Sequence, residues 1–132
     1  MGRGSTNKRM GSNAERLYAK IFRDLGFSHC LTSRQGSRIH DDAGVDLINL
    51  PFNVQLKAGK QRGLNPTSEL RSIDERLKTM FPKDQSKLER SRPLVLIHRK
   101  HVGRGKRRDE YDDLVSMSFK DFKQLIEKIE WD

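Results

Sequence analysis

The chain has 132 residues, enough for one domain with a hydrophobic core. Hydrophobic residues make up 33% and charged residues 34%, so the apolar side chains must be concentrated in a few elements. Lysine and arginine number 27 against 18 acidic residues, which gives a formal net charge of +9. This excess favours a polyanionic partner, and nucleic acid is the first candidate.

Several other classes of protein are disfavoured. No apolar run approaches the length of a membrane span, and the N-terminus shows no apolar leader. Cys30 is the only cysteine, which excludes an internal disulfide and agrees with a reducing compartment. We therefore expect a cytoplasmic, nucleoid-associated protein, or one of the host cytoplasm if the source is viral. We expect neither a membrane partner nor a small-molecule substrate.

The N-terminal segment, residues 1–11, is rich in glycine, serine and basic residues and has no apolar periodicity. This composition predicts a flexible basic arm, in which Arg9 could reach phosphates. Residues 12–132 are then expected to form a single domain.

A helix is predicted to begin after this arm. Ser12 and Glu15 have the spacing of a capping box, and apolar residues follow at helical spacing until Gly26 ends the helix. Glu15 therefore has a sufficient structural explanation, because the glutamate of a capping box hydrogen-bonds the amide of the first residue.

Residues 45–58 predict a β-hairpin. The second half of this stretch alternates apolar and polar residues, the period of a strand with one buried face, and the turn is centred on Leu50 and Pro51. Facing residues then have numbers that sum to 101, so Asp46 lies opposite Gln55.

This pairing would bring Asp46, Gln55 and Lys57 together on one face. Oxygen ligands with an adjacent ammonium can hold a hard divalent cation in a phosphodiesterase arrangement. The alternative is an ordinary strand pair with its polar face in water. Asp41 and Asp42 precede the hairpin and are either further ligands or solvated loop acids.

The rest of the chain predicts a mixed α/β sheet flanked by helices. Phe122, Leu125, Ile126 and Ile129 form an apolar stripe that we interpret as a core or dimer contact. The expected elements are a short strand over residues 27–32, a loop over 33–38, a helix opened by Asn65 and Pro66 and ended by Pro82, a charged connector over 83–92, a buried central strand over 93–98, a strand over 113–117 and a last helix capped by Ser118 and Asp121.

Two loops carry basic residues suited to phosphate contact. A glycine-serine pair lies between two arginines in residues 33–38, and residues 99–108 hold six basic residues without local acids to balance them. The expected DNA-contacting residues are Arg9, Arg34, Arg38, Lys60, Arg62, Arg99, Lys100, Arg104, Lys106, Arg107 and Arg108.

The order of these signals resembles that of the archaeal-type Holliday junction resolvases, which belong to the PD-(D/E)xK nuclease superfamily. The resemblance is close over residues 8–60 and continues beyond them in element order only. It is carried by Gly11-Ser12-x-x-Glu15-Arg16, Gly26-Phe27, Arg34, Gly36-Ser37, Val45-Asp46-Leu47 and Val54-Gln55-Leu56-Lys57.

This resemblance implies a restriction-endonuclease-like fold, with a mixed β-sheet core flanked by α-helices. It also implies a homodimeric, Mg²⁺-dependent endonuclease that cuts four-way DNA junctions by paired hydrolytic nicks, with Mn²⁺ able to substitute. By position, Glu15 is similar to the helical acid near the metal and Asp46 to the metal-binding carboxylate. Lys57 is similar to the lysine that ends the motif, and Ser37 to the loop serine near the scissile phosphate.

Gln55 departs from the family pattern, which has a glutamate or aspartate there. A glutamine keeps a carbonyl oxygen in place, so Asp46, Gln55, Glu15 and the Leu56 carbonyl are the expected metal ligands. The alternatives are a sequence- or mismatch-directed nicking or homing endonuclease on the same fold, and a catalytically inactive DNA-binding module that has lost the acid.

Overall fold

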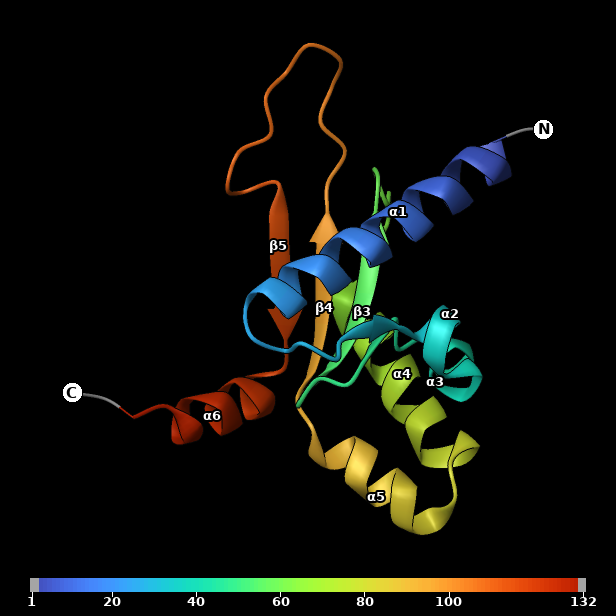
Figure 1. Cartoon of the computed structure of the whole chain (residues 1–132), viewed down its shortest axis with the longest axis vertical. Helices are drawn as coiled ribbons and strands as arrows, with labels where there is room; N and C mark the ends of the chain where they lie inside the picture. The colour runs from blue at the N-terminus through green and yellow to red at the C-terminus, as the bar shows by residue number, and fades with distance from the viewer. Residues whose placement is uncertain (1–2, 131–132) are drawn as a thin grey trace.

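The computed structural model describes residues 3–130, with side chains from Arg9 onward, and within them a five-stranded mixed sheet is flanked by helices (Figure 1). The predicted α/β class is confirmed. The strands are β1 (Leu31–Thr32), β2 (Leu47–Ile48), β3 (Asn53–Ala58), β4 (Leu94–Arg99) and β5 (Asp113–Met117), and the helices are α1 (Arg3–Asp24), α2 (Ser33–Gly36), α3 (Arg38–Ala43), α4 (Pro66–Met80), α5 (Lys83–Ser91) and α6 (Phe119–Lys128).

The strand order is β1-β2-β3-β4-β5, and only the β3–β4 pair is parallel. Leu47 pairs with Val54, which confirms the predicted hairpin register. The Asp46 amide also donates to the Val54 carbonyl at 2.7 Å. The apolar run in β4 lies between β3 and β5, as expected for a strand covered on both faces.

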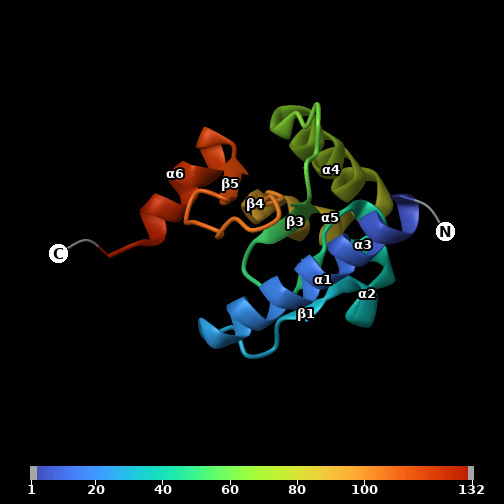
Figure 2. The same cartoon turned by 90° about the horizontal axis from the view of Figure 1, so that it is seen from above.

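Helices cover both faces of the sheet (Figure 2). Helix α1 lies on one face, where Tyr18 and Ala19 pack with Val54 and Val95. Helix α4 lies on the other face, where Ile73 packs with hydrophobic residues of α3 and β4. The alternative interpretation of residues 45–58, an ordinary strand pair with its polar face in water, is wrong for Gln55, which is only 6% exposed, because the β3–β4 pairing places this strand inside the sheet.

The N-terminal segment is the largest departure from expectation. Helix α1 begins at Arg3, so the predicted flexible arm is wrong for residues 3–11. Once a helix is nucleated, each further residue gains one hydrogen bond for one residue fixed, which is less costly than nucleation, so the helix extends through this polar sequence. Ser12 lies inside α1 and cannot act as its N-cap, and the predicted capping box is absent.

Other connectors also contain helix. Residues 33–38 form α2 and the start of α3 rather than a loop, and the expected strand over residues 27–32 shortens to β1. The charged connector over residues 83–92 is helix α5, which buries Ser86 and Glu89. Its buried face is polar, so the apolar periodicity that usually marks a helix is missing from the sequence.

The later elements agree with their local signals. The Asn65 side chain accepts from the Ser68 amide at the start of α4, and the Ser118 hydroxyl accepts from the Asp121 amide at the start of α6. Strand β5 has its predicted bounds. Helix α6 has no buried residue, however, so the interpretation of its apolar stripe as core of this chain is wrong. Among the described residues, no helix has the length and apolarity needed to cross a membrane.

Candidate metal and nucleic-acid site

A cavity of about 900 Å³ contains most of the predicted site residues. It lies between α1, the β2–β3 hairpin and the segment that follows β3. Its walls include Glu15, Arg34, Asp46, Gln55, Leu56, Lys57, Lys60, Arg62 and His101. The four expected metal ligands and Lys57 are therefore brought together, Ser37 is not among them, and three of the predicted DNA-contacting residues surround them.

Asp46 is fixed by the hairpin. Its Oδ2 accepts a hydrogen bond from the Leu56 amide at 2.7 Å, which orients the carboxylate toward the β3 side of the cavity. Burial raises the pKa of Asp46 to about 7 against the opposing effect of this hydrogen bond, and the nearby charges of Glu15 and Asp41 add to the rise. A carboxyl held in this way is costly to ionise unless a cation approaches it.

Gln55 lies opposite Asp46 and is only 6% exposed. Its Oε1 is buried, and no donor among the described residues lies within hydrogen-bonding distance. A buried carbonyl oxygen without a partner costs free energy, so it calls for a ligand. A divalent cation that prefers oxygen fits this position, because Asp46 supplies a carboxylate beside it.

Glu15 reaches the cavity from α1. Its side chain is paired with Arg34, whose Nε lies 2.9 Å from Oε2 and whose Nη2 donates to Oε1 at 3.3 Å. Burial raises the pKa of Glu15 and outweighs the lowering effect of Arg34. The capping explanation of Glu15 is thus replaced by an ion pair within the predicted site.

Lys57 points to the same cavity and pairs with Glu69 of α4, with 3.6 Å between Nζ and Oε2. Sequence reasoning missed Glu69 and His101. Glu69 is brought to Lys57 by the crossover between the parallel strands β3 and β4, and no short-range spacing signals this contact. His101 follows β4 in the long basic loop, and only the packing of that loop places it at the cavity.

The acids available for a metal are few. Among residues 9–130, no group of three histidine, cysteine, aspartate or glutamate side chains is arranged to hold an ion. A cation here would depend on the Gln55 oxygen as well as on carboxylates. Asp41 contributes negative charge near Asp46 and accepts from the Ser33 hydroxyl at 3.4 Å, whereas Asp42 pairs with Arg38 at the surface.

Ser37 is not part of this cavity. It caps α3, and its Oγ lies 2.6 Å from Nδ1 of His40. The other ring nitrogen of His40 lies 3.0 Å from Glu89 Oε1, and this chain of contacts borders a separate cavity of about 490 Å³. The structure therefore does not bring Ser37 to Asp46.

Most of the predicted DNA-contacting residues fall into two groups. Arg34, Lys60 and Arg62 border the cavity, whereas the long β4–β5 loop protrudes from the end of the sheet (Figure 1). Within this basic stretch, Arg99 and Arg108 pair with Asp113 at 3.0 and 2.6 Å. The expectation that the stretch lacks local acids is wrong for these two residues. Lys100, Arg104, Lys106 and Arg107 are exposed, as is Arg9 on α1.

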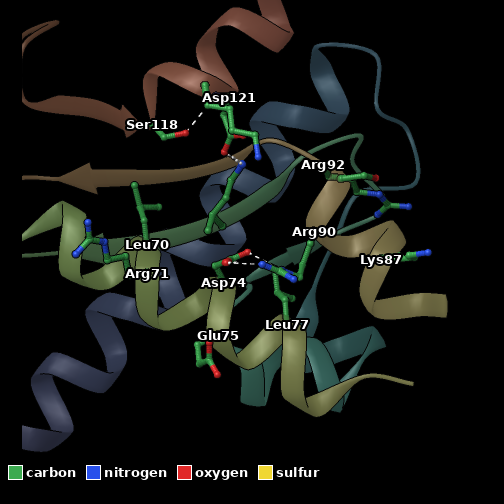
Figure 3. A pocket seen from close by; sticks show the side chains of 13 residues that line it. Leu70, Arg71, Asp74, Glu75, Leu77, Lys87, Arg90, Arg92, Ser118 and Asp121 are labelled. Carbon is green, nitrogen blue, oxygen red and sulfur yellow. Dashed lines mark hydrogen bonds and ion pairs between the residues drawn. The ribbon is translucent and has the colours of Figure 1, made fainter. Parts of the chain in front are cut away.

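A different cavity, of about 700 Å³, lies between α4, α5 and the start of α6 (Figure 3). Arg90 and Asp74 form a two-contact ion pair across it at 3.0 and 3.1 Å. Asp121 accepts from the Leu94 amide at 3.0 Å in the same region. This cavity holds none of the predicted site residues.

Comparison with known proteins gives no independent guide. No protein-family model, curated protein or solved structure matches the chain. Function is therefore inferred from the chemistry of the cavity around Asp46.

Proposed function

We propose that the chain is a metal-dependent DNA endonuclease whose reaction centre is the cavity around Asp46. The observation that carries the proposal is the buried carbonyl oxygen of Gln55, which has no partner among the described residues and lies opposite the Asp46 carboxyl. Basic side chains border the same cavity and suit a polyanionic substrate. A carboxyl with a strongly raised pKa in a cleft is a common sign of a functional site.

Asp46 and Gln55 would hold a Mg²⁺ or Mn²⁺ ion. Glu15 would join them, directly or through water, once it is released from Arg34. The bound ion would supply the positive charge that activates water and stabilises the phosphoryl transition state. The chain itself supplies orientation, since the Leu56 amide fixes Asp46 and Glu69 holds the Lys57 ammonium at the cavity wall.

Arg34, Lys60 and Arg62 would bind the phosphates of the substrate. The choice of four-way DNA junctions as substrate, and of paired nicks in a homodimer as the reaction, rests on the sequence resemblance to the archaeal-type resolvases. Branched or duplex DNA of other kinds would suit the same basic surface.

A second candidate is a DNA-binding module without nuclease activity. Two observations favour it: a glutamine stands where the resolvases that the sequence resembles have a second acid, and Glu15 is already paired with Arg34. In this case the basic residues alone would account for function.

One assay separates these candidates. The purified protein is incubated with a synthetic four-way junction, a linear duplex with the same arms and a single strand, each with and without Mg²⁺. We expect Mg²⁺-dependent paired nicks in the junction alone, lost in Lys57→Ala and retained in Lys87→Ala, a lysine outside the cavity. Binding without cleavage in any metal would identify the inactive module. Cleavage of the linear duplex would identify a sequence- or mismatch-directed enzyme.

A further inference from the structure

A serine, a histidine and a glutamate form a chain of contacts at the wall of the cavity of about 490 Å³. The Oγ of Ser37 lies 2.6 Å from Nδ1 of His40, and Nε2 of His40 lies 3.0 Å from Oε1 of Glu89. Ser37 and His40 lie at the start of α3, whereas Glu89 comes from α5, 49 residues after His40. Tertiary packing therefore completes a set of side chains that no local spacing predicts.

The partners of the His40 ring decide where its proton lies. An ionised carboxylate only accepts hydrogen bonds, so Nε2 of His40 carries the proton and donates it to Glu89. In the neutral ring, Nδ1 is then free to accept from the Ser37 hydroxyl. The two ring nitrogens are used in the opposite order from the serine proteases, but the proton moves in the same direction, from serine to histidine.

The imidazole ring is held in this orientation by its surroundings. The side chain of His40 is only 15% exposed, and that of Glu89 is 5% exposed. The ring of Phe81 packs edge-on against His40, with 5.0 Å between the ring centroids. A base that is fixed by a third group and lies within hydrogen-bonding distance of a hydroxyl is the arrangement that activates a serine nucleophile.

One oxygen of Glu89 shows that this arrangement is more than a link between α3 and α5. Only Oε1 contacts His40, whereas Oε2 is buried and has no hydrogen-bond donor among the described residues. The nearest cation, Nη1 of Arg92, lies 3.9 Å away, beyond hydrogen-bonding distance. A buried oxygen without a donor calls for a donor that enters the cavity.

We propose that Ser37, His40 and Glu89 form a second hydrolytic centre, separate from the cavity around Asp46, that acts on small uncharged carboxylic esters. Ser37 is the nucleophile and His40 is the general base. Glu89 is a positioning residue, because it acts on the substrate only through the His40 ring, which it orients and whose positive charge it stabilises during the reaction.

The reaction consumes one ester and one water. The Ser37 Oγ bonds to the ester carbonyl carbon while its proton passes to Nδ1 of His40, and His40 then gives this proton to the alcohol as the bond to the alkoxy oxygen breaks. Water attacks the resulting acyl-serine and gives a proton to His40. The carboxylic acid leaves as the proton returns to Ser37, so atoms and charges balance.

The walls of the cavity indicate the class of ester. Ile48, Leu50 and Phe52 line it and suit an apolar acyl group. Arg92 is the one permanent cation among the described residues that line the cavity, and it can offset the charge that develops on the carbonyl oxygen. Arg92 and Glu89 together give the cavity no net charge, which favours an uncharged substrate. The volume is within the range of small-molecule sites, roughly 300–1,000 Å³.

The test uses p-nitrophenyl acetate and phenylmethylsulfonyl fluoride in a buffer with a chelator. Release of p-nitrophenolate measures the reaction, and mass spectrometry of peptides locates the modified serine. The internal reference is Ser118, which also caps a helix, is more exposed than Ser37 and forms no hydrogen bond to a histidine in the described part of the chain. We expect Ser37 to be modified at least about 100-fold faster than Ser118, because only Ser37 has a base beside it.

Two variants test the roles of the partners. His40→Gln and Glu89→Gln should each slow modification of Ser37 by about 100-fold or more. In Glu89→Gln the maximal rate should fall while the ester concentration for half-maximal rate stays within about twofold, whereas a merely structural role would alter both or neither. Ser118→Ala is the control variant and should react like the wild type.

Circular dichroism checks that each variant is folded. If His40→Gln is unfolded, Glu89→Gln and the comparison of Ser37 with Ser118 in the wild type decide the outcome. The proposal is overturned if Ser37 is modified no faster than Ser118, or if the folded variants react like the wild type. The readout needs neither DNA nor metal, so a failed nuclease assay does not affect it.

Discussion

The cavity around Asp46 and the apolar stripe of α6 depart from ordinary burial in opposite directions. In the cavity, Glu15 and Gln55 are polar and buried, and one oxygen of Gln55 lacks a partner among the described residues. At the other end, Phe119 and Phe122 are apolar and exposed. Each arrangement costs the isolated chain free energy, since buried polar groups lose water and exposed apolar groups order it.

The contrast indicates the kind of partner that each region requires. An unsatisfied oxygen beside a carboxyl is stabilised by a cation, and the basic wall around it is stabilised by phosphates. Exposed apolar side chains are stabilised by a contact that removes them from water. The chain therefore separates a positively charged cavity from a near-neutral apolar end.

The largest expected effect concerns chemistry in the cavity. Asp46→Asn should reduce junction cleavage by about 1,000-fold or more, because a neutral amide lacks the negative charge of the carboxylate that we propose binds the metal. Junction affinity should stay within a few-fold of wild type. Asp42→Asn, which changes an acid paired with Arg38 at the surface, is the control. A parallel loss of binding in Asp46→Asn would show that Asp46 serves phosphate contact or folding instead.

The same substitution should stabilise the metal-free protein. Burial raises the pKa of Asp46 from 3.8 to about 7, so the folded state retains a proton that the unfolded chain loses. The wild-type free energy of unfolding should therefore fall as the pH rises from about 4 to about 7 and remain low above that. At about 1.4 kcal/mol per pKa unit, discounted for partial exposure, Asp46→Asn should be more stable by about 1–3 kcal/mol near pH 8.

Urea denaturation in a chelator at several pH values measures this difference. The difference in free energy of unfolding between Asp46→Asn and the wild type should vanish toward pH 4 and be largest above neutral pH. Added Mg²⁺ should stabilise the wild type and leave Asp46→Asn unchanged. Equal stability of the two proteins near pH 8 would show that burial of the ionised Asp46 carboxylate does not destabilise the fold.

Substitutions in the exposed basic loop between β4 and β5 test whether the DNA-binding region extends beyond the cavity. Arg99 and Arg108 are engaged by Asp113, so the residues free to reach phosphates are Lys100, Arg104, Lys106 and Arg107. Replacing these four by glutamine should lower the slope of log K against log salt by about 0.9 for each lost contact, or about 2 if half of them contact DNA. Replacing Lys78, Lys83 and Lys87 on the far helices is the control, and an unchanged slope in the loop variant would exclude the loop.

The smallest effect is expected at Gln55. If its carbonyl oxygen binds the metal, Gln55→Glu should lower the Mg²⁺ concentration needed for cleavage by roughly tenfold, because a carboxylate of the same length binds the cation more strongly. Gln55→Ala should raise the requirement. Metal titrations at saturating junction measure both effects. If neither substitution shifts the requirement, Asp41 becomes the better candidate ligand, and cleavage gained only in Gln55→Glu would identify the wild type as a binding module.

Local chemistry predicted much of the fold. The caps at Asn65 and Ser118 act over three residues, and the turn at Leu50 and Pro51 sets a register that places Asp46 opposite Gln55. The residues that make each of these contacts lie within a few positions of one another, so the spacing of residue types in the sequence predicts them. Helix α5 escaped prediction because the residues that it buries, Ser86 and Glu89, are polar.

The sequence by itself determined the hairpin that joins Asp46, Gln55 and Lys57, the excess of positive charge and the apolar stripe of α6. Only the tertiary structure decided that Glu15 meets Arg34 instead of the Ser12 amide, that Ser37 contacts His40 away from the cavity, and that the stripe stays uncovered. The physical reason is the range of the interactions. Hydrogen bonds within a turn or cap are set by adjacent residues, whereas ion pairs and apolar contacts between distant elements depend on how the whole sheet and its helices pack.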